Sequence, residues 1–84
     1  MMKIRCFGSE RIFAGEPVEL LRQIWASVHE THDSIEEYLI STCATGKILG
    51  GKYANLTFSG TTDEERADSF IKSCIESGII MVEP

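Results

Sequence analysis

The sequence predicts an α+β fold with two layers, in which a sheet of three or four strands is covered on one face by three helices. Four short segments have the alternating or continuously apolar pattern of strands: 3–7, 10–14, 54–58 and 79–82. Three segments that begin near Pro17, Ser34 and Thr62 repeat apolar residues at the three-to-four spacing of amphipathic helices. The expected order is strand, strand, helix, helix, strand, helix, strand, in a single domain that spans residues 1–84.

The first two strands are expected to form a hairpin around Gly8-Ser9. This pair suits a two-residue type II′ turn, because only the first turn position requires a positive φ. In the resulting register Ile4 lies opposite Phe13, and Cys6 lies opposite Arg11. The face that carries Ile4, Cys6 and Phe13 is the more apolar one, so we expect it to face the core.

Pro17 is expected to open the first helix, since its missing N–H is not needed there and its fixed φ is already helical. Glu16 and Glu19 suit the positive end of that helix. The helix would continue to Val28. Its apolar stripe covers nearly half of the circumference and consists of Val18, Leu20, Leu21, Ile24, Trp25 and Val28.

The second helix is expected to begin at Ser34, because Glu37 follows three residues later and the pair has the spacing of a capping box. Its apolar face consists of Ile35, Tyr38, Leu39 and Cys43, and Ile40 lies off that face. The end of this helix is open between two positions, Gly46 and Gly50-Gly51.

The segment 54–58 alternates apolar and polar residues and is interpreted as a strand with one buried face. Thr62 and Glu65 then form a second capping box, and Gly78 stands where a left-handed residue would end the helix. The inner face of this helix consists of Ala67, Phe70, Ile71, Cys74 and Ile75. If the flanking strands were adjacent and parallel, their helical crossover would be right-handed.

The composition excludes several classes of partner. The chain has 84 residues and a net charge of -5, so electrostatic repulsion opposes its binding to nucleic acid or anionic lipid.

No segment has the pattern of a secretion signal or a membrane-spanning helix, so a cytoplasmic location is expected. Cys6, Cys43 and Cys74 are odd in number and far apart, which favours reduced, buried thiols.

Several motif-like segments do not support catalysis or metal binding. His29 and His32 are three residues apart, whereas a zincin helix needs them four apart, and a cluster with Asp33 would still lack a ligand. The segment 44–48 resembles the end of a P-loop, but Ile48 replaces the hydroxyl residue that binds magnesium. The acidic residues Asp63, Glu64, Glu65 and Asp68 suit a helix start. No catalytic residue, metal or cofactor is therefore assigned, and binding is favoured over catalysis.

Two hypotheses for function remain. The first is a binding or accessory protein, or a homodimer, that acts through protein–protein contact at Trp25, Leu20 and Ile40, because tryptophan is enriched at contact centres. The alternative is a small-molecule sensor or minor enzyme with its site near the loop 46–52. The residues assigned to that alternative site are Lys47, Lys52, His29 and His32.

Three short patterns resemble those of small bacterial proteins of unknown function. They are Gly15-x-Pro17-x-Glu19-Leu20-Leu21-x-Gln23, Glu37-Tyr38-Leu39 and Gly60-x-Thr62-x-Glu64-Glu65-Arg66-Ala67. The resemblance spans most of the chain and implies no activity, cofactor or site residue.

Overall fold

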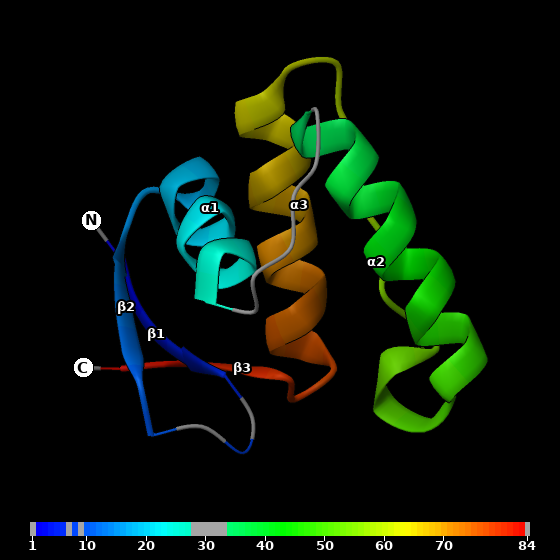
Figure 1. Cartoon of the computed structure of the whole chain (residues 1–84), viewed down its shortest axis with the longest axis horizontal. Coiled ribbons are helices and arrows are strands. Elements are labelled where there is room, and N and C mark those ends of the chain that lie inside the picture. The colour runs from blue at the N-terminus through cyan, green and yellow to red at the C-terminus, as the bar shows by residue number, and fades with distance from the viewer. Residues whose placement is uncertain (1, 7, 9, 28–33, 84) are drawn as a thin grey trace.

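The computed structural model describes residues 2–6, 8, 10–27 and 34–83 (Figure 1). Their elements are, in order, β1 (Met2–Cys6), β2 (Ile12–Gly15), α1 (Pro17–Ser27), α2 (Ile35–Leu49), the short 3-10 helix η1 (Gly51–Tyr53), α3 (Asp63–Glu76) and β3 (Ile80–Val82). The described residues thus form one three-stranded sheet and three α-helices, which confirms the predicted α+β class.

The sheet has the strand order β2-β1-β3, with both neighbouring pairs antiparallel. Ile4 pairs with Phe13 in the β1–β2 ladder, so the predicted hairpin register is confirmed. Gly8 has a φ of 77°, the positive value that the first position of the predicted turn requires; Ser9, its second position, lies outside the described residues. Ile4 and Phe13 are buried and Cys6 is half-buried, so the predicted face is the inner one.

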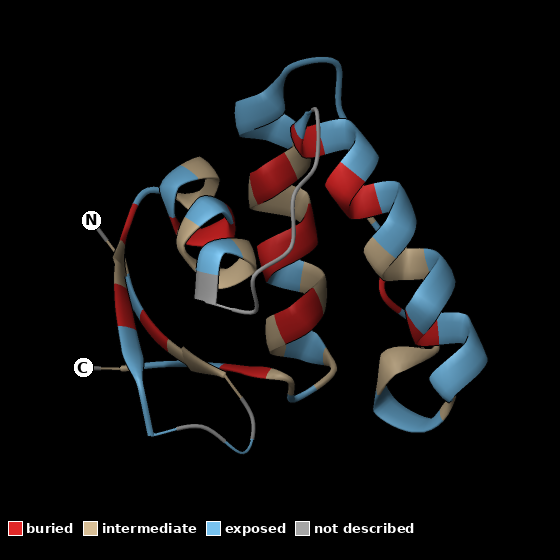
Figure 2. Ribbon diagram, in the orientation of Figure 1, coloured by how far each residue is buried: buried red, intermediate tan, exposed pale blue. Residues whose placement is uncertain are grey.

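All three helices lie on one side of this sheet. Figure 1 shows α1 and α3 next to the strands, and α2 on the far side of α3. The buried residues, red in Figure 2, form one core between these elements. The core consists of Ile4, Phe13, Leu20, Leu21, Ile35, Tyr38, Leu39, Leu56, Ala67, Phe70, Ile71, Cys74 and Ile80.

The segment 54–58, which the alternation favours as a strand, lies outside the sheet and runs beside α3. Two serines of α3 accept hydrogen bonds from the backbone in and just after this segment: Thr57 N–H donates to Ser73 Oγ at 3.0 Å, and Ser59 N–H donates to Ser69 Oγ at 2.8 Å. These helix side chains take the place of a partner strand, because backbone donors must find an acceptor somewhere. The open choice between three and four strands is therefore decided at three, and β3 pairs antiparallel with β1.

The predicted start of α2 is confirmed, since Glu37 N–H donates to Ser34 Oγ at 3.1 Å. Of the two open ends, the structure selects the later one: α2 runs to Leu49 and stops at Gly50, whose φ is 73°. Gly46 lies inside the helix instead.

The third helix has the predicted signals at both ends. Glu65 N–H donates to Thr62 Oγ1 at 3.1 Å, and Thr62 N–H donates to Glu65 Oε1 at 3.2 Å, which completes the capping box. Hydrogen bonds from the Thr61 side chain and backbone, and then from Thr62, hold the pKa of Glu65 below its usual value. At the other end Gly78 has a φ of 78° and Ile79 N–H donates to the Cys74 carbonyl at 2.9 Å, as in a Schellman motif.

Candidate functional site

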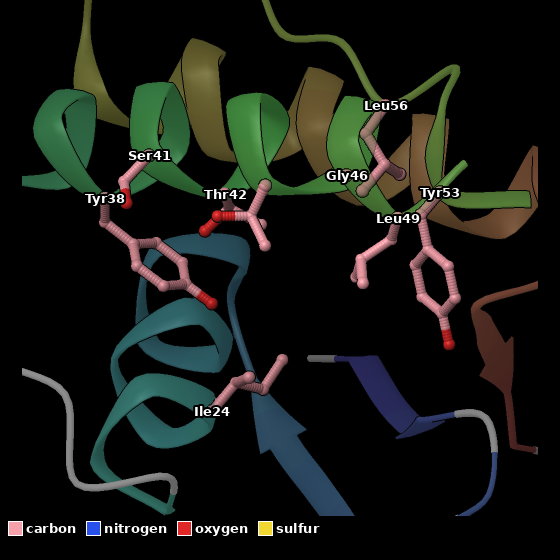
Figure 3. Close-up of a pocket in the computed structure, with 9 residues that line it drawn as sticks. Ile24, Tyr38, Ser41, Thr42, Gly46, Leu49, Tyr53 and Leu56 are labelled. Carbon is pink, nitrogen blue, oxygen red and sulfur yellow. The ribbon is translucent and has the colours of Figure 1, made fainter.

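A groove of about 430 Å³ lies between α1 and α2 and is closed at one end by η1 (Figure 3). In Figure 3, Tyr38 points from α2 toward α1, and Ile24 extends from α1 into the same space. The groove is lined by Ile24, Tyr38, Ser41, Thr42, Thr45, Gly46, Leu49, Tyr53 and Leu56.

The closed end of the groove depends on Gly46. A Cβ at this position would collide with the carbonyl oxygen of Tyr53, so only glycine lets η1 fold back against α2. The turn is further held by Gly50 N–H, which donates to the Gly46 carbonyl at 2.9 Å, and by Tyr53 N–H, which donates to the Gly50 carbonyl at 3.2 Å. Gly46 is buried within a helix because it is a point of close backbone approach.

At the other end of the groove α1 and α2 meet through an aromatic pair. The rings of Trp25 and Tyr38 have centroids 4.7 Å apart and an interplanar angle of 72°, an edge-to-face contact. This contact fixes the Tyr38 ring that lines the groove.

A second pocket of about 170 Å³ adjoins the groove, and we call it the interior pocket because most of its lining residues belong to the core. Five residues line both pockets: Ile24, Tyr38, Thr42, Tyr53 and Leu56. The interior pocket is completed by Cys6, Leu21, Phe70, Cys74, Ile79 and Ile80, and its wall is almost entirely carbon and sulfur. The two adjoining pockets together form one site, in which the hydroxyl groups lie mainly in the groove and the interior pocket is lined mainly by core residues.

The described residues that line this site are uncharged. Among the described residues, no charged side chain lines the groove or the interior pocket, and the polar groups there are mainly hydroxyls. Burial raises the pKa of the Cys6 thiol, and it raises the pKa of Cys74 to about 12 with smaller contributions from Cys43 and Cys6. Both thiols therefore stay protonated at neutral pH, whereas a cysteine nucleophile must be a thiolate.

Metal binding finds no support in the part of the chain that the structure describes, since no group of three or more ligating side chains comes together there. His29, His32 and Asp33, the residues weighed as a metal cluster, lie outside the described residues.

The three residues predicted as an interface have different surroundings. Leu20 is fully buried in the core, so it supports α1 from within and offers no surface to a partner. Trp25 is half-buried against Tyr38, next to the groove. Ile40 is 56% exposed on the side of α2 that faces away from the core.

The residues of the alternative site are not brought together. The expected loop is partly helical, and Lys47 is an exposed residue of α2 that lines neither the groove nor the interior pocket. Lys52, in η1, lines a separate polar pocket of about 390 Å³ with Asn55, Thr57, Ser73, Glu76 and Ser77. His29 and His32 are again outside the described residues. The groove lies close to the predicted place, but it is apolar and not cationic.

Sequence reasoning missed Ser41, Thr42, Thr45 and Tyr53 as site residues. In the sequence the three hydroxyl residues on α2 look like ordinary exposed helix positions, and Tyr53 has no neighbouring motif. All six α2 residues that line the groove, at positions 38, 41, 42, 45, 46 and 49, share one face of the helix. This spacing is the one signal in the sequence that groups them, and it becomes specific once α1 is known to lie opposite.

Comparisons of the chain with protein-family models, with curated proteins and with solved structures found no match. The resemblance to small bacterial proteins therefore stays a prediction. Within the described residues, no helix combines the length and the apolar character needed to cross a membrane.

Proposed function

We propose that this protein is a small binding protein that takes up its ligand in the groove between α1 and α2. The observation that carries the proposal is the pairing of this groove with the apolar interior pocket that adjoins it. Concave apolar sites with a few polar groups are the usual form of small-molecule binding sites. Protonated thiols and an uncharged lining support binding over catalysis.

A fluorescence titration with Nile red, an uncharged apolar dye, tests this proposal. The test variant is Thr45→Arg, which places a charge in the groove lining. The matched control is Ala44→Arg, which adds the same charge at the adjacent exposed residue of α2, outside the lining. We expect saturable binding to the wild type and to Ala44→Arg. Binding to Thr45→Arg should be at least about tenfold weaker, because the arginine side chain would occupy part of the groove and a loss of roughly 1.4 kcal/mol of binding free energy already has that effect.

Two results would contradict the proposal. The first is the absence of saturable dye binding to the wild type. The second is an equal effect of both arginines, which would place the dye elsewhere. Circular dichroism of each variant checks that the helices remain formed.

A second candidate function is self-association through α2, and one observation favours it. Ile40, Ala44 and Ile48 repeat at every fourth residue on the same side of the helix, and the two isoleucines are 56% and 85% exposed. Large exposed apolar side chains in a row are typical of contact surfaces. This row lies beside the groove-lining positions and does not include them.

The same two variants test self-association with their roles exchanged. Ala44→Arg places a charge in the apolar row, and Thr45→Arg lies outside it. Light scattering over a wide concentration range should show that the wild type and Thr45→Arg are dimers and that Ala44→Arg is a monomer. A wild type that stays monomeric at every concentration rejects the homodimer.

A further inference from the structure

The lining of the site also indicates the chemical class of its ligand, an inference that rests on the proposed function. We infer that the ligand is an uncharged amphiphile, such as an alcohol, a phenol or an ester. Its apolar end, a short alkyl chain or a single ring, occupies the interior pocket. Its oxygen-bearing end lies in the groove.

The size of the interior pocket limits the apolar end. Its volume is about 170 Å³. An engineered apolar cavity of about 150 Å³ in another protein stays dry and binds benzene, so this pocket has room for one ring or a short chain. Cys6 and Cys74 line the interior pocket but not the groove, so a change at either position alters the interior pocket alone.

The lack of charge in the lining selects against ionic ligands. In the described part of the chain the walls of both pockets carry no acidic or basic side chain. A carboxylate or an ammonium group that enters the interior pocket would lose hydration, and it would gain no ion pair in either pocket. The net charge of -5 further disfavours an anion.

The polar end of the ligand is matched by hydroxyl groups on one side of α2. Ser41, Thr42 and Thr45 line the groove, and Thr42 also lines the interior pocket. Each hydroxyl can donate one hydrogen bond and accept others, so the row can bind either an alcohol or a carbonyl oxygen. Thr42 stands where the apolar end of the ligand would meet its polar end.

Three probes with the same eight-carbon chain test the inference: 1-octanol, octanoate and octylammonium. Binding is followed through the emission of Trp25, the one tryptophan in the sequence, because its ring contacts Tyr38 and Tyr38 lines both pockets. We expect 1-octanol to bind at least about tenfold more tightly than either ion, since desolvating a charge without a partner is costly.

The results separate the two proposals. Equal or tighter binding of octanoate or octylammonium overturns the inference about ligand class. If none of the three probes binds while Nile red binds as described above, the inference also fails but the proposed function stands. If Nile red does not bind either, both proposals fail.

The depth of insertion is tested at Cys6. Cys6→Leu reduces the volume of the interior pocket, and Cys6→Ala is the control that does not reduce it. Each methylene that enters the pocket should raise affinity about fourfold, so wild-type affinity should rise steadily from 1-butanol to 1-octanol. Cys6→Leu should lower the affinity for 1-octanol by about fourfold for each methylene displaced from the pocket, and it should leave the affinity for 1-butanol unchanged.

Two results would contradict insertion into the interior pocket. The first is a wild-type affinity that does not change from 1-butanol to 1-octanol, and the second is an equal loss of affinity for both alcohols in Cys6→Leu. If Cys6→Leu does not fold, the wild-type series decides the question alone.

Discussion

Replacing Gly46 with alanine should destabilise this protein, although alanine is the better helix former. In an ordinary helix interior the change would add about 1 kcal/mol to the free energy of unfolding. Here the new Cβ would collide with the carbonyl oxygen of Tyr53 and lie 3.3 Å from its carbonyl carbon. Both are backbone atoms, so no side-chain rotation relieves the contact, and η1 has to move.

The two effects have opposite signs, and their sizes decide the outcome. Forcing an extra group into a packed site costs about 1 to 3 kcal/mol, and a collision with backbone belongs at the upper end of that range. After the gain in helix propensity is subtracted, we expect Gly46→Ala to lower the free energy of unfolding by about 1 to 2 kcal/mol. For a domain of this size that corresponds to a fall in Tm of about 4 to 8 °C per kcal/mol.

Urea unfolding, followed by circular dichroism, measures this change. Ala44→Gly calibrates helix propensity at an exposed position of the same helix and should cost about 1 kcal/mol. Gly46→Ala should also weaken Nile red binding, because Tyr53 lines the groove. A Gly46→Ala variant that is more stable than the wild type would refute the close approach of η1 to α2.

Three further predictions concern α3. Phe70→Ala, in the core, should cost about 3 to 5 kcal/mol in urea unfolding, against about 0.5 to 2 for the N-cap variant Thr62→Ala. Asp68→Ala should change stability by less than about 0.5 kcal/mol, because its 2.9 Å ion pair with Lys72 is exposed to solvent; equal effects of Phe70→Ala and Asp68→Ala would show that the inner face is misassigned. The pKa of Glu65 is lowered in the folded state. Its contribution to the free energy of unfolding is therefore present above the usual glutamate pKa and is lost as the pH falls through the folded-state pKa. Unfolding measured from neutral pH to about pH 3 should therefore depend less on pH in Glu65→Gln than in the wild type, and identical pH profiles would count against the capping box. Finally, burial raises the pKa of the Cys74 thiol to about 12, so this thiol should react with a thiol reagent at neutral pH only after denaturant is added. Rapid reaction in the native protein would show that the thiolate forms there, against the raised pKa.

The local features of the fold could be predicted because each depends on residues close together in the sequence. The Gly8 turn set the hairpin register, in which Ile4 pairs with Phe13. The helix starts at Ser34 and Thr62 depend on a side chain three residues from the N–H that it binds. In the same way Gly78 ends α3 through hydrogen bonds within one turn.

The sequence did not show which elements pack against each apolar helix face. Leu20 widened the stripe of α1 and was interpreted as a contact residue, but it is fully buried. The reason is that α1 packs on β2 on one side and on α3 on the other, so a wide stripe covers two partners. A helical pattern gives the width of an apolar face and not the number of elements that cover it.

The sequence by itself determined where most elements begin and end, and which of their faces are apolar, because turns, caps and periodicity act over three or four residues. Tertiary structure decided the rest. The segment 54–58 is no strand, because Ser69 and Ser73 bind the backbone at Ser59 and Thr57, 10 and 16 residues away. The groove is likewise built from α1, α2, η1 and Leu56, and it exists only because Gly46 admits the carbonyl of Tyr53. Contacts of that range depend on how the whole chain packs, and no short window of sequence contains them.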